Sequence, residues 1–344
     1  MARTPALLTL TREQILRFRR QVGALDARLP FGAKSLRTAA WAGLQDSAPR
    51  AALLSLHARV AGVTAASWEH PSLVQLWGPR YNDYVVAARD LAVFSLGRLP
   101  NQPRRAARAH DTTDRLHAHL AGRRLPFGVA GREMGVAANS LRYATLTGRV
   151  LLRWDGARQP EVWMVPAPEV APAQARLELA RRYLHVFGPA MPAAFARWGG
   201  IGAAEASSPF RDLGRELLPV RTPSGEAWML AADEPAMRAA AATPVAPARL
   251  LPSGDAYFLL WERMRELLVP GARQRALLWT SRVWPGALLI GGEVAGTWRR
   301  AGAVVTVAPW RRLTAAEWAA IEAEVMALPL PGPLVLEREA GLRR

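Results

Sequence analysis

The chain has 344 residues, of which 45 are Lys or Arg and 28 are Asp or Glu, so its formal net charge is +17. This excess attracts polyanions, and nucleic acid is the leading candidate partner. Cysteine is absent, which excludes disulfides, thiolate nucleophiles and thiolate-bound zinc. The sequence has neither a signal peptide's apolar core nor an apolar run of ~18 residues, so we expect a cytoplasmic, nucleoid-associated protein without a membrane span.

One pattern of elements recurs three times along the chain: two or three short helices, then two strands joined by a turn. This order is typical of a winged helix, a helix-turn-helix variant that binds DNA through its third helix or its wing. The three predicted units cover residues 1–97, 98–168 and 169–235. The second is the clearest, because Asp155-Gly156 is a turn signal between two apolar runs rich in Val and Trp.

The predicted element boundaries follow apolar periodicity, caps and turn residues. The first unit has predicted helices over 11–22, with Thr11 as its cap, 35–44 and 49–61, and strands over 73–77 and 84–86. The second has predicted helices over 112–121, 126–134 and 137–147, and strands over 149–154 and 161–165. The third has predicted helices over 175–186, 191–198 and 202–213, and strands over 216–220 and 226–230.

After the third unit, the chain becomes rich in Ala and Pro without a hydrophobic period, and 236–248 is predicted to be a linker. Residues 249–344 are predicted to form a small β domain with a covering helix. Its predicted elements are strands over 287–290, 293–299 and 303–307, and a helix with Thr314 and Glu317 in a capping box. The predicted fold class is α+β, with tandem winged-helix domains and a C-terminal small β domain.

Arginines cluster at places suited to contacts with phosphates or the minor groove. Four of them, Arg98, Arg104, Arg105 and Arg108, are predicted to lie in a Pro-punctuated connector, and Trp-Arg-Arg occurs at 298–300 and 310–312. The predicted DNA-binding residues are Arg50, Arg80, Arg104, Arg105, Arg108, Trp298, Arg299 and Arg300. Any one arginine could instead be an ordinary exposed residue, and a strand-borne Trp is usually core. The six histidines are scattered, so we predict no metal site and no cofactor.

Residues 43–51 read GLQDSAPRA, which places an amide, a carboxylate and a hydroxyl at Gln45, Asp46 and Ser47. We predict these three residues to be catalytic. Gln45 can hold a water molecule through donor and acceptor atoms, Asp46 can act as a base or an electrostatic stabiliser, and Ser47 can form hydrogen bonds. Alternatively, Asp46 or Ser47 caps a helix that starts near Pro49.

The same stretch resembles the Gly-Leu-Gln-x-Gln-x-Pro-Arg-Ala signature of the AlkZ/YcaQ-type winged-helix DNA glycosylases. Trp77 and Arg80 match the family's Trp-x-x-Arg, and residues 266–270 (ELLVP) match its Leu-Leu-x-Pro segment. Residues 286–299 (GALLIGGEVAGTWR) resemble its hairpin ending in Gly-Thr-Trp-Arg. The chain departs from the family at Ser47, where the second catalytic Gln or Asp is expected, and after Arg80, where Arg-Gly-Thr-x-His is replaced.

The resemblance implies tandem winged helices and a β-barrel-like C-terminal domain that clasp duplex DNA. This fold is compatible with a monomer, which we expect. The implied activity is hydrolysis of the N-glycosidic bond of alkylated purines, chiefly N7 adducts, including interstrand crosslinks. Since Lys34 is the only lysine, and a lyase step needs an amine, we expect a monofunctional enzyme. Asp83 is a second candidate carboxylate in case Asp46 faces away. One alternative is a winged-helix transcription regulator. The other is a non-catalytic damage binder, and the change at Ser47 favours this second alternative.

Overall fold

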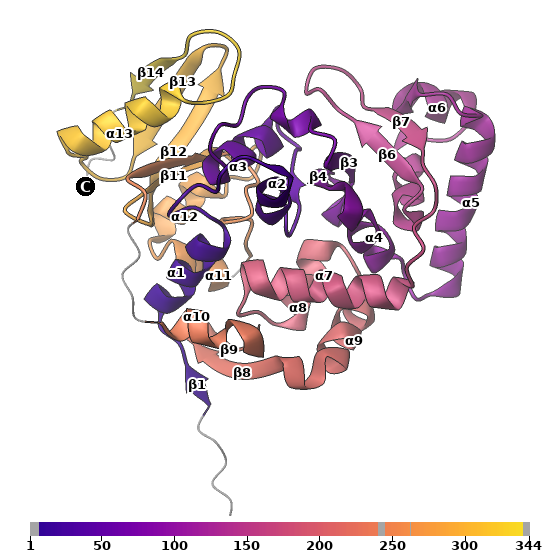
Figure 1. Cartoon of the computed structure of the whole chain (residues 1–344), viewed down its shortest axis with the longest axis horizontal. Coiled ribbons are helices and arrows are strands. Elements are labelled where there is room, and N and C mark those ends of the chain that lie inside the picture. The colour runs from indigo at the N-terminus through magenta and orange to yellow at the C-terminus, as the bar shows by residue number, and fades with distance from the viewer. Residues whose placement is uncertain (1–6, 240–244, 262, 340–344) are drawn as a thin grey trace, which may run out of the picture.

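The computed structural model describes residues 7–239, 245–261 and 263–339, and it confirms the α+β class, with helices around three sheets (Figure 1). Helix α1 (Arg12–Val22) begins where predicted. Thr11 accepts a hydrogen bond from the Gln14 N–H, and the Gln14 side chain accepts one from the Thr11 N–H, so both free donors are satisfied. The other N-terminal elements are β1 Leu8–Thr9, α2 Ala33–Ala39, β2 Leu44–Gln45, α3 Ala51–Arg59, β3 Leu73–Trp77, β4 Asp83–Ala87 and α4 Leu91–Phe94.

The first two predicted hairpins belong to one six-stranded sheet, ordered β2-β4-β3-β6-β7-β5, rather than to two separate wings. Strands β6 (Val150–Arg153) and β7 (Glu161–Met164) form the second hairpin. The hairpins meet where Gln75 of β3 pairs with Leu152 of β6. The Gln75 side chain reinforces this junction, because its oxygen accepts a hydrogen bond from the Trp154 N–H at 2.7 Å.

Helix α5 (Pro103–Leu120) begins well before the start predicted at residue 112. Pro103 occupies the first turn, where its missing N–H costs little and its fixed φ favours the helix. Arg104, Arg105 and Arg108 therefore lie on a helix, and their prediction as part of a connector is wrong. The other elements of this region are β5 Leu125–Pro126, α6 Phe127–Glu133 and a 3-10 segment, Ala138–Thr147, where we predicted a helix.

The third region is built on a three-stranded sheet that the N-terminus completes. Strand β1 runs parallel to β8, with Leu8 opposite Val220, so the predicted hairpin gains a strand from more than 200 residues away. The elements are α7 Pro172–Phe187, α8 Pro192–Gly199, α9 Ala203–Leu213, β8 Leu217–Thr222 and β9 Gly225–Leu230. The stretch predicted as a linker overlaps α10 (Glu234–Arg238), and its residues 240–244 lie outside the described residues.

The C-terminal region forms a five-stranded sheet, ordered β10-β11-β12-β13-β14, with α13 beside it (Figure 1). Helix α13 (Ala315–Met326) starts at the predicted capping box, in which Thr314 and Glu317 exchange hydrogen bonds. Ile321 and Val325 of this helix are buried against the sheet. The other elements are β10 Ala248–Leu251, α11 Arg263–Leu268, α12 Ala272–Leu278, β11 Gly286–Ile290, β12 Glu293–Ala301, β13 Val304–Pro309 and β14 Val335–Arg338.

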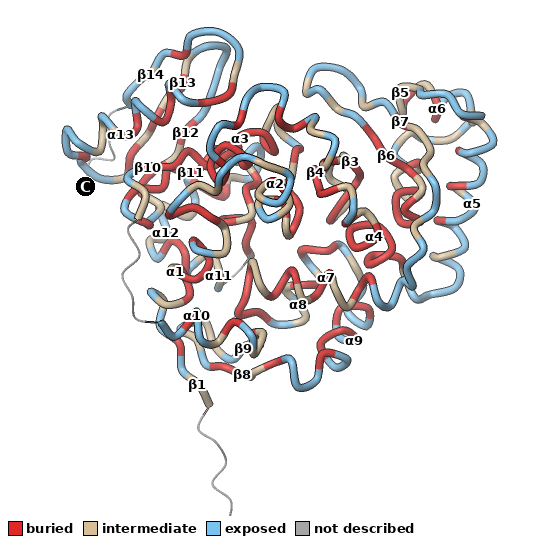
Figure 2. Tube along the Cα trace, viewed as in Figure 1, coloured by how far each residue is buried: buried red, intermediate tan, exposed pale blue. Residues whose placement is uncertain are grey.

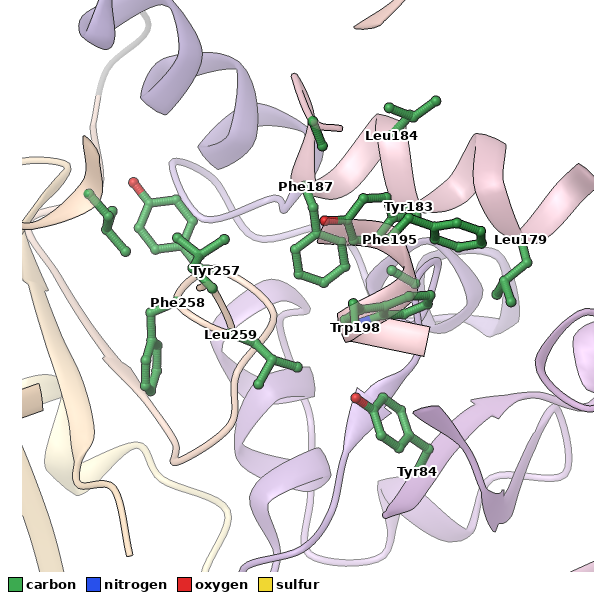
Figure 3. Packing of buried hydrophobic residues seen from close by; sticks show 14 of the residues in the cluster. Tyr84, Leu179, Tyr183, Leu184, Phe187, Phe195, Trp198, Tyr257, Phe258 and Leu259 are labelled. Carbon is green, nitrogen blue, oxygen red and sulfur yellow. The ribbon is translucent and has the colours of Figure 1, made fainter. Parts of the chain in front are cut away.

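The largest hydrophobic core contains residues from all these regions, and the buried residues lie in the interior, where the regions meet (Figure 2). Its centre is an aromatic cluster from α7 and α8, in which Tyr183 lies 5.1 Å from Phe187 and 5.2 Å from Trp198 between ring centroids (Figure 3). Tyr84 of β4 and Tyr257 belong to the same cluster. Burial of large rings makes such contacts a major source of stability, so the regions fold against one another rather than as isolated units.

A buried ion pair fixes the loop 252–261 against α3. The Arg59 guanidinium makes two hydrogen bonds to Asp255, of 2.6 and 2.7 Å, and the Ser55 hydroxyl donates a third at 2.7 Å. The Asp255 side chain is completely buried, and that of Arg59 is 3% exposed. The pair is satisfied in a region that excludes water, so losing one partner would leave an uncompensated charge.

Asp255→Ala should lower the free energy of unfolding by about 3–5 kcal/mol, because the Arg59 guanidinium loses its buried counter-ion. Glu226→Gln is the control, since it removes an exposed ion pair with Arg221 and should cost less than about 1 kcal/mol. Urea denaturation of both variants measures the difference. A similar loss in the two variants would show that the buried pair does not hold the loop.

Candidate active site

Gln45 ends strand β2 and is held in place through its side-chain oxygen. The strand pairs with β4, which sets Gln45 opposite Tyr84. Nη2 of Arg80 donates a hydrogen bond to the Gln45 oxygen at 2.8 Å, and the Tyr84 hydroxyl lies 3.4 Å from the same oxygen. The amide nitrogen lies beside Gly254, at which a Cβ atom would approach it to 3.0 Å. Gln45 is therefore oriented by its neighbours, and no side chain larger than glycine fits at 254 without a shift.

A cavity of about 320 Å³ opens in front of Gln45. Its walls come from three distant parts of the chain and carry an amide, two hydroxyls, two guanidinium groups and two indoles. The lining residues are Gln45, Ser47, Ala48, Arg80, Ser253, Gly254, Leu259, Trp261, Arg282, Val283 and Trp284. None of these described lining residues is acidic, so the cavity is positively charged.

Arg80 occupies an unusual backbone conformation at the edge of this cavity. Its φ is 56°, and that of Tyr81 is 59°, so two successive non-glycine residues adopt the left-handed region. Such residues are costly and cluster at functional sites. The Arg80 guanidinium lies 4.9 Å from the ring of Trp261, and its Nη1 is buried without a hydrogen-bond partner. The guanidinium is thus fixed by an aromatic ring and by Gln45, with one donor unused.

Asp46 points away from the cavity. In an extended segment successive side chains alternate, so Gln45 and Ser47 share one face and Asp46 lies on the other. Asp46 accepts hydrogen bonds from the Ala52 N–H at 2.9 Å and from the Gln75 amide at 2.8 Å. It is 3% exposed. The structure therefore shows the capping alternative for Asp46, whose side chain does not line the cavity.

Burial raises the pKa of Asp46 to about 7. The nearby Asp83 raises this pKa further, while the hydrogen bonds from Ala52 and Gln75 and the charge of Arg50 lower it. Burial also raises the pKa of Asp83, to about 6. Asp83 is on the Asp46 side of the sheet and is not among the cavity-lining residues, so neither candidate carboxylate forms part of the cavity wall.

The predicted DNA-binding residues fall into two groups. Arg104, Arg105 and Arg108 are exposed on α5, and Arg299 and Arg300 are exposed on β12. The last two line a second cavity of about 290 Å³, which shares Ala48, Ser253, Val283 and Trp284 with the first.

The other group is less accessible. Arg50 is half-buried, with its guanidinium 4.5 Å from the Trp68 ring. Trp298 is only 5% exposed, and its Nε1 donates a hydrogen bond to the Leu251 carbonyl, so most of its ring is packed in the core, with one part facing the second cavity beside Arg299 and Arg300. Arg98 is likewise buried, with hydrogen bonds to the carbonyls of Trp77 and Gly199.

Four polar or aromatic residues of the cavity were not predicted: Ser253, Trp261, Arg282 and Trp284. The Pro-Ser-Gly-Asp stretch at 252–255 is a recognisable turn signal, but nothing in it indicates proximity to Gln45, about 200 residues away. Residue type is the only sequence signal for Trp261 and Trp284, and it does not single them out as site residues, since Trp is frequent both in cores and at binding sites.

A basic cavity with a fixed glutamine amide, on an α+β scaffold with exposed arginines, suits a protein that acts on nucleic acid. The AlkZ-like DNA glycosylase family matches residues 38–329. The chain therefore belongs to the AlkZ-like DNA glycosylases. Its fold is similar to that of Streptomyces sahachiroi DNA glycosylase AlkZ, with a TM-score of 0.75 at 18% sequence identity over 96% of this chain and 100% of that one. No curated protein sequence matches the chain.

Two features are absent from the described residues. In that part of the chain, no three His, Asp or Glu side chains come close enough together to hold a metal ion. None of the described helices is both long enough and apolar enough to cross a membrane.

Asp46→Asn should change how stability depends on pH. Folding raises the pKa of Asp46 from 3.8 to about 7, so between these values the folded state holds a proton that the unfolded chain has released. Stability then falls as pH rises across this window, by at most about 4 kcal/mol from this group. The variant cannot titrate, so its profile should be flatter. Urea denaturation from pH 4 to pH 8 measures this, and parallel profiles would contradict it.

Proposed function

We propose that the protein is a monofunctional, monomeric DNA glycosylase that hydrolyses the N-glycosidic bond of N7-alkylated purines in duplex DNA, including those in interstrand crosslinks. The observation that carries the proposal is the Gln45 amide, fixed at the wall of a basic cavity with Ser47 on the same face. These two side chains occupy the first and last positions of the motif that resembles the family's catalytic Gln-x-Gln.

The chemistry of the substrate explains why such a cavity suffices. An N7-alkylated purine carries a positive charge and leaves as a neutral base, so it needs no strong general acid. The remaining task is to hold a water molecule against the sugar as its bond to the base breaks. The Gln45 amide and the Ser47 hydroxyl can both hydrogen-bond that water, because each combines donor and acceptor capacity. A cavity without a carboxylate favours these labile substrates over unmodified, neutral bases.

The remaining cavity groups suit a displaced nucleotide. Trp261 and Trp284 offer apolar ring surface to a base that has left the duplex. Arg80 and Arg282 supply positive charge for the flanking phosphates. The adjoining cavity, bounded by Pro49, Leu54 and Pro285 among others, gives space beside the lesion for an alkyl substituent.

The scaffold supports a clasp around the duplex. We interpret the three helix-and-hairpin regions as tandem winged helices and the C-terminal sheet as the barrel-like domain. The exposed arginines on α5 and β12 then contact the DNA backbone from two sides of the Gln45 cavity. Asp46 acts as a positioning residue in this arrangement, because it caps α3 and ties β2 to Gln75.

A non-catalytic damage binder is the second candidate function, and one observation favours it. Ser47 replaces a longer amide or carboxylate at the last motif position, which shortens the reach of that side chain into the cavity. A transcription regulator, in contrast, would bind one particular duplex sequence, and a footprint over a single operator would favour it.

Gln45→Ala should slow single-turnover release of N7-methylguanine from duplex DNA by about 100-fold or more, because the water loses its amide partner. Gln102→Ala is the matched control, since Gln102 is an exposed glutamine at the start of α5 and should retain the wild-type rate. Released base and alkali-induced strand breaks provide the readout. No release by the wild type, with DNA binding intact, would support the damage binder, and an unaffected Gln45→Ala would remove Gln45 from the chemistry.

The absence of a lysine from the Gln45 cavity predicts the product. Lys34 is exposed on α2 and does not line that cavity, so no amine is in place to form a Schiff base with the sugar. The expected product is an intact strand with an abasic site, which breaks only after alkali. Borohydride should trap no covalent protein–DNA adduct, and Lys34→Ala should release base at the wild-type rate. A trapped adduct that Lys34→Ala abolishes would refute this prediction.

A further inference from the structure

A separate cavity of about 370 Å³ lies beside α5 and has no assigned role. This volume is within the range of small-molecule sites and is far larger than a bare phosphate needs. The cavity combines basic, aromatic and aliphatic walls with one carboxylate. Its lining includes Arg98, Arg105, Arg108, Tyr81, Tyr143 and Glu205.

The mouth of this cavity is positively charged. Arg105 and Arg108 are exposed on α5, and within the described chain neither has an acidic side chain as an ion-pair partner. Their donors are therefore available to an anion, and guanidinium groups bind phosphate oxygens in pairs of parallel hydrogen bonds. The arrangement suits a phosphate at the entrance.

Two packed tyrosine rings form an aromatic wall of this cavity. The rings of Tyr81 and Tyr143 meet edge to face, with centroids 5.3 Å apart. Each ring also carries a guanidinium group, that of Arg98 at 5.0 Å from Tyr81 and that of Arg108 at 4.3 Å from Tyr143. These contacts fix the aromatic walls in place, so a planar ligand meets preformed surfaces.

Two buried polar groups face the same cavity. Nη2 of Arg98 is buried without a hydrogen-bond partner, although the other nitrogens of this side chain are engaged. Glu205 is 8% exposed, and one of its oxygens accepts a hydrogen bond from the Asn101 N–H. Its carboxylate would repel a bare anion but can accept a hydrogen bond from the N–H groups on the Watson–Crick edge of a base.

The cavity shares a wall with the Gln45 site. Arg80 lines the Gln45 cavity, and its neighbour Tyr81 lines this one. Gly200, which also lines this cavity, packs on the Arg80 backbone so closely that a Cβ atom would lie 2.9 Å from the Arg80 Cα. Two adjacent residues of one turn thus line two different cavities. The cavity beside α5 is therefore within reach of a nucleotide close to a lesion bound in the Gln45 cavity.

We propose that this cavity binds an unpaired nucleotide of the DNA next to the lesion, with its phosphate on Arg105 and Arg108 and its base between the tyrosine pair on one side and Glu205 on the other. The assignment of the nucleotide to DNA rests on the proposed function, whereas nucleotide binding itself does not.

The test compares two adjacent arginines of α5 in the full-length protein. Both are exposed, but Arg105 lines the cavity and Arg104 does not. Calorimetry with deoxycytidine 5′-monophosphate, deoxycytidine and inorganic phosphate should show the tightest binding for the nucleotide. Arg105→Ala should weaken it about tenfold, as expected for loss of a charge-assisted contact, and Arg104→Ala should change it less than about twofold. The preference for a duplex with one bulged cytidine over a fully paired duplex should also fall in Arg105→Ala and be retained in Arg104→Ala.

Equal losses in the two variants would overturn the proposal, because they would indicate a general charge effect. Phosphate binding as tight as the nucleotide, or no nucleotide binding at millimolar concentration, would overturn it too. Base release measured on the same preparations separates this outcome from the proposed function. Normal release with equal effects of the two variants rejects only the nucleotide site, and the expected nucleotide binding without release rejects only the glycosylase.

Discussion

The candidate active site depends on the buried ion pair between Arg59 and Asp255. Arg59 is the last residue of α3, and the first turn of that helix is capped by Asp46, which directly follows Gln45. The ion pair holds the loop 252–261 on the same helix, and this loop supplies the wall facing Gln45. The two sides of the cavity are therefore connected through one helix, although they lie about 200 residues apart in the chain. A shift of either end of α3 would change the width of the cavity.

The alternation of side chains along residues 45–47 places the proposed catalytic side chains on one face and the structural side chain on the other. Gln45 and Ser47 reach the cavity, and Asp46 turns into the sheet, where it is shielded from water. If Asp46 instead faced the cavity, its charge would offset the arginines that attract DNA. With Asp46 buried on the other side, the cavity remains positively charged. A positive cavity is poorly suited to stabilise a cationic sugar by itself, and the DNA phosphates proposed to lie on Arg80 and Arg282 would balance this charge.

Local sequence signals predicted two helix starts and the hairpins, but not the start of α5 at Pro103. The capping boxes at Thr11 and Thr314 mark the starts of α1 and α13, and turn residues mark the hairpins, because these features depend on neighbours within a few positions. Long-range pairings could not be predicted in this way. The junction of the two hairpins at Gln75 and the approach of the loop 252–261 to Gln45 depend on contacts that leave no periodic signal in the sequence.

The strained turn at Arg80 and Tyr81 forms part of the wall of both cavities. In a regular strand, neighbouring side chains would point to opposite faces of the sheet, and one of them would be buried in the core. Strand β3 has already ended at Trp77, and in the turn that follows, the left-handed residues Arg80 and Tyr81 line one cavity each. Gly200 permits this geometry, since any side chain there would collide with the Arg80 backbone. The energetic cost of the turn is offset by packing, and its benefit is that one rigid element sets the spacing between the proposed lesion site and the proposed nucleotide site.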